Sequence, residues 1–251
     1  MNKVKFGNTG IEVPRLCIGT GTYGVGGRSS QADVSCEYYG IILARSIDFG
    51  MNFWDTSDDY GTHPHIAEAL KTVKRDKVII ATKSHAQTGE DMRLGVEESL
   101  KELNTDYIDI MLMHEVDDMQ DYMDRSSALS ELHKFKKEGI IKAVGASTHS
   151  IDILEFLVNL SEIDVIMTNY NIDEDHMDAG IRDYDNALKV AHGNGKGIYV
   201  MKVLGEGRTA HKFEEAVKFA LDKEFIHSAC IGINKMEELE ALREFAKLKI
   251  N

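Results

Sequence analysis

Two hydrophobic patterns take turns along most of the chain. Short runs that are almost wholly apolar, as strands buried on both faces are, alternate with longer stretches whose apolar residues recur every three or four positions. The short runs predict strands at 15–20, 51–54, 78–83, 107–114, 141–147, 163–169, 197–203 and 227–233. The longer stretches predict helices at 30–46, 66–73 and 95–103, a long helix ending near 137, and helices at 151–160, 181–192, 211–221 and from 235 onward. Ser30 is the expected N-cap of the first helix, and Gly139 stops the fourth.

This alternation predicts a (β/α)8 TIM barrel. About eight strand–helix units of similar length follow one another, which is typical of that fold. Residues 3–13 alternate in polarity and turn at GNTG, so a short N-terminal β-hairpin should precede the barrel. With two prolines and no linker or repeat, we expect a single domain over residues 1–251.

Composition and charge exclude several functional classes. Apolar residues make up 43% of the 251 positions and charged residues 28%, which is ordinary for a globular protein with a sizeable core. A net charge of −13, with a basic cluster only at 71–77, argues against nucleic-acid binding. Neither a leader nor a run of about 18 apolar residues is present, so we expect a cytoplasmic protein without membrane contact. Three widely spaced cysteines argue against a disulfide framework or a cysteine-ligated metal site.

Three consecutive predicted strands end in ionisable residues. Asp55 closes the strand at 51–54, Lys83 the next, and His114 the third, while Tyr60 lies in the loop after Asp55. Barrel active sites lie at the carboxyl ends of the strands, so these four side chains should share one site.

Together these residue types suit acid–base catalysis at a carbonyl group. A tyrosine hydroxyl has a reference pKa of about 10 and transfers its proton more readily beside a positive charge, which Lys83 supplies. Asp55 would hold the ammonium, and His114 would hydrogen-bond the carbonyl or relay a proton. No side chain delivers hydride, so the chemistry implies a nicotinamide cofactor. GTGTYG at 19–24 matches a dinucleotide-binding glycine motif, but the helix begins too late after it and Asp55 follows too far on.

The chain resembles the aldo-keto reductase family. The resemblance rests on GTGTYG, FWDTSDDYG, VIIATK, VEESLKELNTDYIDIMLMHEVDD and LHKFKKEGIIKAVGAST, and it is densest from residue 19 to residue 148. It implies NAD(P)H-dependent reduction of a small-molecule aldehyde or ketone, with NADPH as the expected cofactor and NADH as the alternative. It also implies that Asp55, Tyr60, Lys83 and His114 form the catalytic tetrad and that Tyr60 is the general acid.

The resemblance, together with the positive charges of Lys202 and Arg208 that would suit the cofactor phosphates, predicts a set of cofactor-binding residues. They are Gly21, Thr22, Tyr23, Ser147, Thr148, Met167, Met201, Lys202, Arg208, Gly232, Asn234 and Lys235. Several positions depart from the family pattern. Thr148 stands where an asparagine is common, and Met167 where a glutamine is common. Met201 or Lys202 replaces an aromatic residue, and Ala241 and Leu242 replace a Glu-Asn pair near the adenosine end.

Two other functions stay open at this point. Lys202, at the end of a late strand, could form a Schiff base as in lyase-type aldolases. A non-catalytic nucleotide-binding regulatory protein on the same fold is the other alternative. We expect no metal site, because no acidic partner is apparent for His85 or for the histidines of 63–65, which should lie in loops. The physiological substrate and the oligomeric state leave no trace in the sequence.

Overall fold

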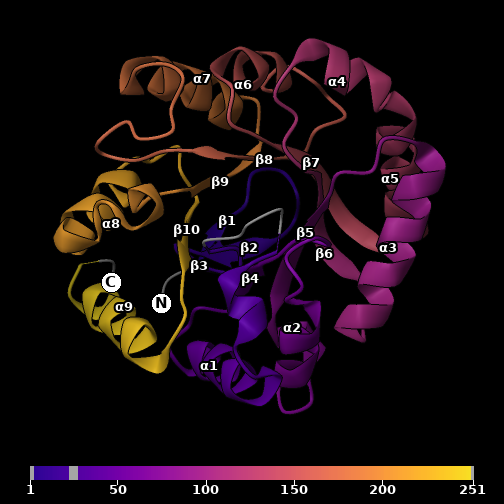
Figure 1. Ribbon diagram of the computed structural model, residues 1–251. Helices are drawn as coiled ribbons and strands as arrows, with labels where there is room; N and C mark the ends of the chain where they lie inside the picture. Colours follow the sequence, from indigo (N-terminus) through magenta and orange to yellow (C-terminus); the bar gives the residue numbers. More distant parts are fainter. Residues whose placement is uncertain (1–2, 23–27, 250–251) are drawn as a thin grey trace.

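A closed barrel of parallel strands forms the centre of the computed structural model, which describes residues 3–22 and 28–249 (Figure 1). Within these residues eight parallel strands pair in the order β10-β3-β4-β5-β6-β7-β8-β9, so the predicted (β/α)8 barrel is confirmed. The strands are β3 (Leu16–Gly19), β4 (Phe53–Asp55), β5 (Ile79–Ser84), β6 (Ile108–Met113), β7 (Ile141–Thr148), β8 (Val165–Asn169), β9 (Gly197–Met201) and β10 (Ser228–Gly232).

Helices surround the barrel, as Figure 1 shows. They are α1 (Cys36–Asp48), α2 (His63–Leu70), α3 (Gly89–Leu103), α4 (Met119–Asp124), α5 (Ser126–Glu138), α6 (Ile151–Leu157), α7 (Ile181–Gly193), α8 (Phe213–Leu221) and α9 (Met236–Lys249). Short 3-10 turns lie at Ser30–Asp33, Arg75–Lys77, Gly205–Gly207 and Ala210–Lys212. Among the described residues, no helix combines the length and apolar character that crossing a membrane requires.

The predicted helix at 30–46 is wrong at its start. Ser29 caps only the 3-10 turn at Ser30–Asp33, and the backbone is extended again at Val34. Ser35 then accepts a hydrogen bond from the backbone N–H of Tyr38 and is the true N-cap of α1. Two serine caps in close succession therefore divide the segment, because each satisfies the free N–H groups of a separate helical turn.

The predicted long helix after β6 is two helices, α4 and α5, which meet at Arg125. The guanidinium of Arg125 is buried and donates to the carbonyl oxygens of Ser84, Ala86 and His114 at 2.8–3.1 Å. These inward hydrogen bonds hold the junction against the ends of β5 and β6. The chain does end α5 at Gly139, whose φ of 80° is left-handed, as predicted.

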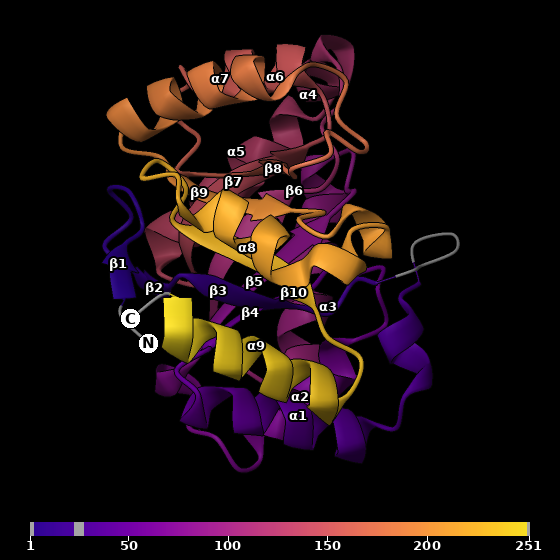
Figure 2. The ribbon, with the colours of Figure 1, turned by 90° about the vertical axis from the view of Figure 1, so that its left-hand side faces the viewer.

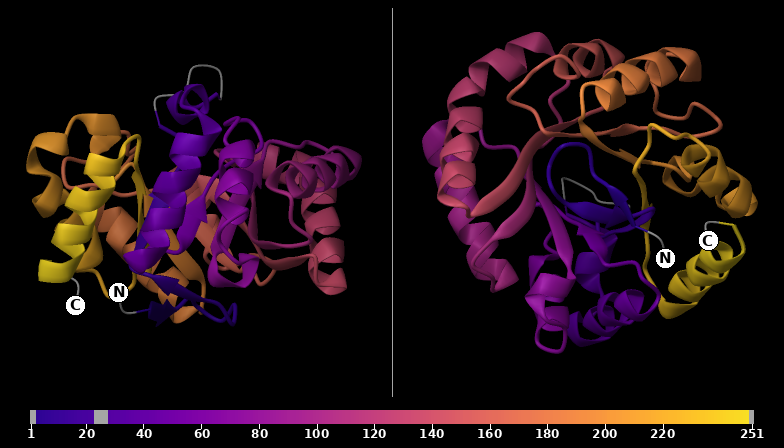
Figure 3. Two further views of the ribbon diagram at one scale, coloured as in Figure 1. Left: turned by 90° about the horizontal axis from the view of Figure 1, so that it is seen from below. Right: turned by 180° about the vertical axis from the view of Figure 1, so that it is seen from behind.

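The hairpin of β1 (Lys3–Lys5) and β2 (Glu12–Pro14) closes the amino end of the barrel (Figures 2 and 3). The hairpin loop places Phe6 inside the barrel, edge-on to Phe53 and Tyr199 with ring centroids 6.0 and 6.1 Å away. A hydrophobic side chain thus fills the floor of the barrel, and the predicted N-terminal hairpin is confirmed. The polar residues that end the strands therefore lie at the opposite, carboxyl end of the barrel.

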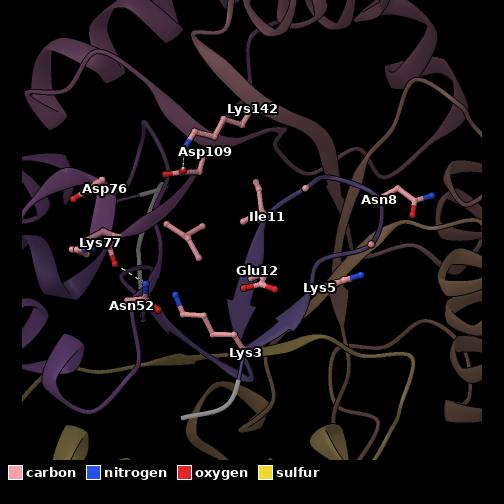
Figure 4. Close-up of a pocket in the computed structure, with 14 residues that line it drawn as sticks. Lys3, Lys5, Asn8, Ile11, Glu12, Asn52, Asp76, Lys77, Asp109 and Lys142 are labelled. Atoms are coloured by element: carbon pink, nitrogen blue, oxygen red, sulfur yellow. Dashed lines mark hydrogen bonds and ion pairs between the residues drawn. The ribbon is translucent and has the colours of Figure 1, made fainter.

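A cavity of about 650 Å³ also lies at the amino end, beside the hairpin (Figure 4). Charged side chains line it, including Lys142, whose ammonium is 2.7 Å from Asp109. Its lining comes from the hairpin and the starts of strands, whereas the predicted catalytic residues lie at strand ends. This cavity is therefore separate from the candidate active site.

Candidate active site

An ion pair between Asp55 and Lys83 forms the base of the site. Asp55 ends β4 and Lys83 lies near the end of β5, its neighbour in the barrel. The Lys83 ammonium donates to both carboxylate oxygens of Asp55, at 2.8 and 2.9 Å, and to the carbonyl oxygen of Thr56 at 2.7 Å. Both side chains are buried, Lys83 at 1% and Asp55 at 4% exposure. Two buried charges that satisfy each other in this way hold a fixed geometry.

Tyr60 lies above this ion pair. The Lys83 ammonium is 5.0 Å from the centroid of the Tyr60 ring, and the ring of His114 meets it edge-on at 5.7 Å. Gly21 packs against the Tyr60 ring, and a β-carbon added to Gly21 would lie 2.2 Å from the nearest ring atom. Glycine is therefore required at position 21 for Tyr60 to keep this place.

The charges around Tyr60 act in opposite directions. Burial raises the pKa of the Tyr60 hydroxyl above its ordinary value, and it outweighs the lowering effect of Lys83. Burial lowers the pKa of Lys83, but its surroundings, the Asp55 carboxylate first among them, raise it by more, so the net pKa lies above the ordinary value. Tyr60 is thus a protonated phenol next to a permanent cation, which suits a group that gives up its proton only as a substrate oxygen gains charge.

His114 follows β6 and is kept neutral. Its Nδ1 is 2.9 Å from the hydroxyl oxygen of Ser57, and its side chain is 5% exposed. Burial, assisted by the charge of Lys83, lowers the pKa of His114 to about 2. A neutral imidazole offers one N–H donor and one acceptor, so it can orient a carbonyl without adding charge.

Tyr199 is a further member of the site that the sequence reasoning missed. It lies on β9, is fully buried, and donates its hydroxyl proton to the second carboxylate oxygen of Asp55 at 2.8 Å. Burial and the Asp55 charge raise the pKa of this hydroxyl, so it remains a donor. Strand alternation places Tyr199 inside the barrel, but its contact with Asp55 depends on barrel closure, which local sequence does not show.

The first group of predicted cofactor residues lies where β3 and β10 end. A β-carbon on Gly232 would be 2.2 Å from the Thr22 hydroxyl, so Gly21, Thr22 and Gly232 gather there. The side chain of Gln31, also missed, links the two ends by donating to the Thr22 hydroxyl at 2.6 Å and the Ile233 carbonyl at 3.4 Å.

One further predicted residue extends this group. Asn234 lies within 3.4 Å of the Ser30 hydroxyl. Tyr23 lies outside the described residues.

The second group lies at the ends of β7 and β8. Ser147 pairs with Met167 and Thr148 with Thr168, and all are buried. Ser147 Oγ accepts from the backbone N–H of Glu115 at 2.9 Å and keeps its own proton to donate. Thr148 instead donates to Asp117 at 3.2 Å. The next inward position on β8 is Asn169, a missed residue whose Oδ1 is buried without a hydrogen-bond partner among the described residues.

The third group of predicted cofactor residues consists of basic side chains that lie close to acidic ones. Lys202 follows Met201 at the end of β9, and its ammonium is 2.9 Å from Glu206. Arg208 pairs with Asp175 at 3.2 Å, and Lys235 lies 4.0 Å from Glu238. These pairs partly neutralise the positive charge that a cofactor phosphate would meet. An ion-paired Lys202 is also unlike the free amine that Schiff-base chemistry needs.

The histidine expectations need correction. His63 and His65 are buried in α2, not in a loop, and His63 has an acidic partner, Glu102, at 2.9 Å. His85 also has one, because its Nε2 lies 3.6 Å from Asp59. The partners were missed because they come from other segments of the chain.

Comparison with known proteins agrees with the barrel fold and identifies the family. The model of the Aldo/keto reductase family matches residues 15–249. The aldo-keto reductase YhdN of Bacillus subtilis is 29% identical over 208 residues, which are 76% of this chain and 60% of that protein. The NADH-specific methylglyoxal reductase of Escherichia coli is 25% identical over 230 residues, or 82% and 68% of the two chains.

A solved structure agrees over nearly the whole length. It is a Pseudomonas aeruginosa protein assigned to the aldo-keto reductases, with a TM-score of 0.83 and 25% identity, and the likeness covers 99% of this chain and 96% of that one. The family match spans nearly all of the barrel. The chain belongs to the aldo/keto reductase family.

Proposed function

We propose that this protein reduces an aldehyde or ketone to an alcohol with a nicotinamide cofactor, and that Tyr60 is the general acid. The observation that supports this most is the buried Asp55–Lys83 pair under the Tyr60 ring. A neutral phenol fixed beside a cation supplies a proton and then stabilises the phenolate that remains. No metal or nucleophile is needed for such a step.

Each neighbour has a distinct task in this proposal. Lys83 stabilises the charge that develops on Tyr60 as its proton moves to the carbonyl oxygen. Asp55 holds the Lys83 ammonium, and Tyr199 holds Asp55 in turn. His114 presents a neutral ring edge-on to Tyr60 and orients the carbonyl.

The residues present fit a nicotinamide carboxamide. A primary carboxamide carries an acceptor oxygen and two N–H donors. The Ser147 hydroxyl has a proton to donate, and Asn169 Oδ1 is a buried acceptor without a partner among the described residues. We therefore propose that Ser147 and Asn169 hold the carboxamide, with Thr22 and Gly232 on the other side of the site. When bound, the cofactor supplies the hydride.

Coenzyme preference is the finer part of the proposal. Family resemblance favours NADPH, whose extra phosphate requires free positive charge. The ion pairs of Lys202 with Glu206 and Arg208 with Asp175, together with the NADH-specific Escherichia coli relative, favour NADH. Fluorescence titration of the purified protein with each coenzyme separates the two. If neither binds, the proposed nicotinamide site is wrong.

Turnover tests the reaction itself. Methylglyoxal is the first substrate to try, since the Escherichia coli relative is named for it, and 4-nitrobenzaldehyde is a second. Tyr60→Phe should lower kcat by roughly 10²- to 10⁴-fold while coenzyme binding persists. Tyr38→Phe, on the exposed surface of α1, is the matched control. Unchanged turnover in Tyr60→Phe would exclude Tyr60 as the acid. Coenzyme binding without turnover of any carbonyl would instead support the regulatory alternative.

A further inference from the structure

A cluster of metal-ligating side chains lies at the rim of the candidate active site. Asp59 precedes Tyr60, His85 follows β5, and His114 follows β6. The ligand atoms of these three residues all lie within 4.8 Å of one another. The imidazole rings of His85 and His114 stack with centroids 4.2 Å apart, and a nitrogen of each ring lies near a carboxylate oxygen of Asp59.

The distances within this cluster are too long for hydrogen bonds and close to those of a metal site. His85 Nε2 is 3.6 Å from Asp59 Oδ2, and His114 Nδ1 is 3.7 Å from Asp59 Oδ1. Ligands of a tetrahedral zinc ion stand about 3.3–3.4 Å apart, given bonds of about 2.0–2.1 Å. The two separations from Asp59 exceed that spacing by only a few tenths of an ångström, and the ligand atoms of His85 and His114 lie within 4.8 Å of each other. Rotation of His85, whose side chain is 44% exposed, can close that gap.

Two further features favour a cation here. Asp59 Oδ1 is buried and has no hydrogen-bond partner among the described residues. Glu115 Oε2 is 3.9 Å from His85 Nε2 and can serve as a fourth ligand. A buried carboxylate oxygen without a donor is costly unless a cation or proton meets it.

We propose that Asp59, His85 and His114 form a binding site for a divalent ion of the zinc class, and that its occupation inhibits carbonyl reduction. Two imidazoles and one carboxylate are the ligand types that zinc prefers, whereas magnesium prefers oxygen ligands alone. The site revises the expectation of no metal, which rested on the missing acidic partner of His85. The binding claim is independent of the proposed reductase activity; only the inhibition rests on it.

Inhibition follows from the position of His114. An ion on its Nδ1 replaces the Ser57 hydroxyl, which now lies 2.9 Å away, and draws the ring toward Asp59. The ring then leaves the orientation in which it meets Tyr60 edge-on. The substrate carbonyl loses its positioning group, and a bound ion narrows the approach to the Tyr60 hydroxyl.

Direct metal binding is the first test. Chelator-treated protein is titrated with Zn²⁺ in competition with a fluorescent zinc indicator, and separately with Mg²⁺. We expect stoichiometric Zn²⁺ binding that Mg²⁺ does not reproduce. His85→Gln and Asp59→Asn should each weaken the affinity at least about tenfold. Because His85 is exposed, His85→Gln should fold normally, which a circular dichroism melt verifies.

The matched control is His149→Gln. His149 also pairs with an aspartate, Asp117, at 3.2 Å, but in the part of the chain that the structure describes no third ligand lies close enough to complete a metal site with them. This variant should bind Zn²⁺ like the unaltered protein. Equal affinity in His85→Gln and the unaltered protein, or no Zn²⁺ binding at all, would overturn the site.

Turnover then tests inhibition separately. Zn²⁺ should slow methylglyoxal reduction, a chelator should restore it, and His85→Gln should require at least about tenfold more Zn²⁺ for the same fractional loss. Each variant is compared with its own zinc-free rate. Full activity at saturating Zn²⁺ would overturn the inhibitory role. Zinc binding in a protein that reduces no carbonyl would contradict only the proposed function.

Discussion

Replacing Lys83 with methionine isolates the contribution of the buried ion pair. Lys83→Met removes a cation that donates to Asp55 twice and to the Thr56 carbonyl once. The Asp55 carboxylate would remain buried with Tyr199 as its donor. Breaking one partner out of a buried pair costs about 3–5 kcal/mol of stability, because the remaining charge is uncompensated. That is a large part of the roughly 5–15 kcal/mol by which domains are stable.

A double variant separates stability from chemistry. Asp55→Asn combined with Lys83→Met removes both charges, so no uncompensated ion remains. The double variant should be more stable than Lys83→Met alone by about 1–3 kcal/mol. It should nevertheless stay inactive, with turnover reduced at least about 100-fold, because the cation beside Tyr60 is still missing.

Urea unfolding followed by circular dichroism measures the stabilities, and coenzyme oxidation with methylglyoxal measures turnover. Lys101→Met is the control, since Lys101 pairs with Glu98 at 3.2 Å on the exposed face of α3. Surface pairs contribute little, so this variant should resemble the unaltered protein in both assays. A Lys83→Met protein as stable as the Lys101→Met protein would refute the reasoning about burial. Recovered turnover in the double variant would refute the role of the Lys83 charge.

Three further predictions follow from individual contacts. Gly21→Ala should push the Tyr60 ring aside, since the added β-carbon would lie 2.2 Å from it, and turnover should fall on the order of 100-fold with stability little changed; normal kinetics would show that the ring has room to move. Tyr199→Phe removes a hydrogen bond to the Asp55 carboxylate and should lower the free energy of unfolding by about 1.5–3 kcal/mol in urea melts; an unchanged free energy of unfolding would show that the hydroxyl is dispensable. Burial lowers the pKa of His227 from 6.5 to about 4, so the unfolded chain binds the extra proton first as the pH falls. The contribution of His227 to stability is therefore complete above pH 6.5 and is lost as the pH falls toward 4, by at most about 1.4 kcal/mol per pH unit. Urea melts at several pH values should show a weaker pH dependence of the free energy of unfolding in His227→Gln.

Sequence by itself determined the barrel and the gathering of three ionisable strand ends at one of its faces. Apolar runs at two periods predict the alternation of strand and helix, since buried strands and amphipathic helices each impose their own spacing. Asp55, Lys83 and His114 could be placed at one face because all carboxyl ends of a parallel barrel point the same way. The sequence predicts helix starts less well. Serines at positions 30 and 35 are both plausible N-caps, and only the structure shows that α1 begins after Ser35.

Tertiary structure alone decided which residues support that face. Tyr199 reaches Asp55 from 144 positions further along the chain, and Asp59, His85 and His114 meet from three different loops. Such contacts depend on the closure and stagger of the barrel, which set the distances between strand ends that are remote in sequence. The local spacing of apolar and polar residues predicts whether a segment is a strand or a helix and which of its faces is buried. Only the folded barrel fixes which polar side chains come within a few ångströms of one another.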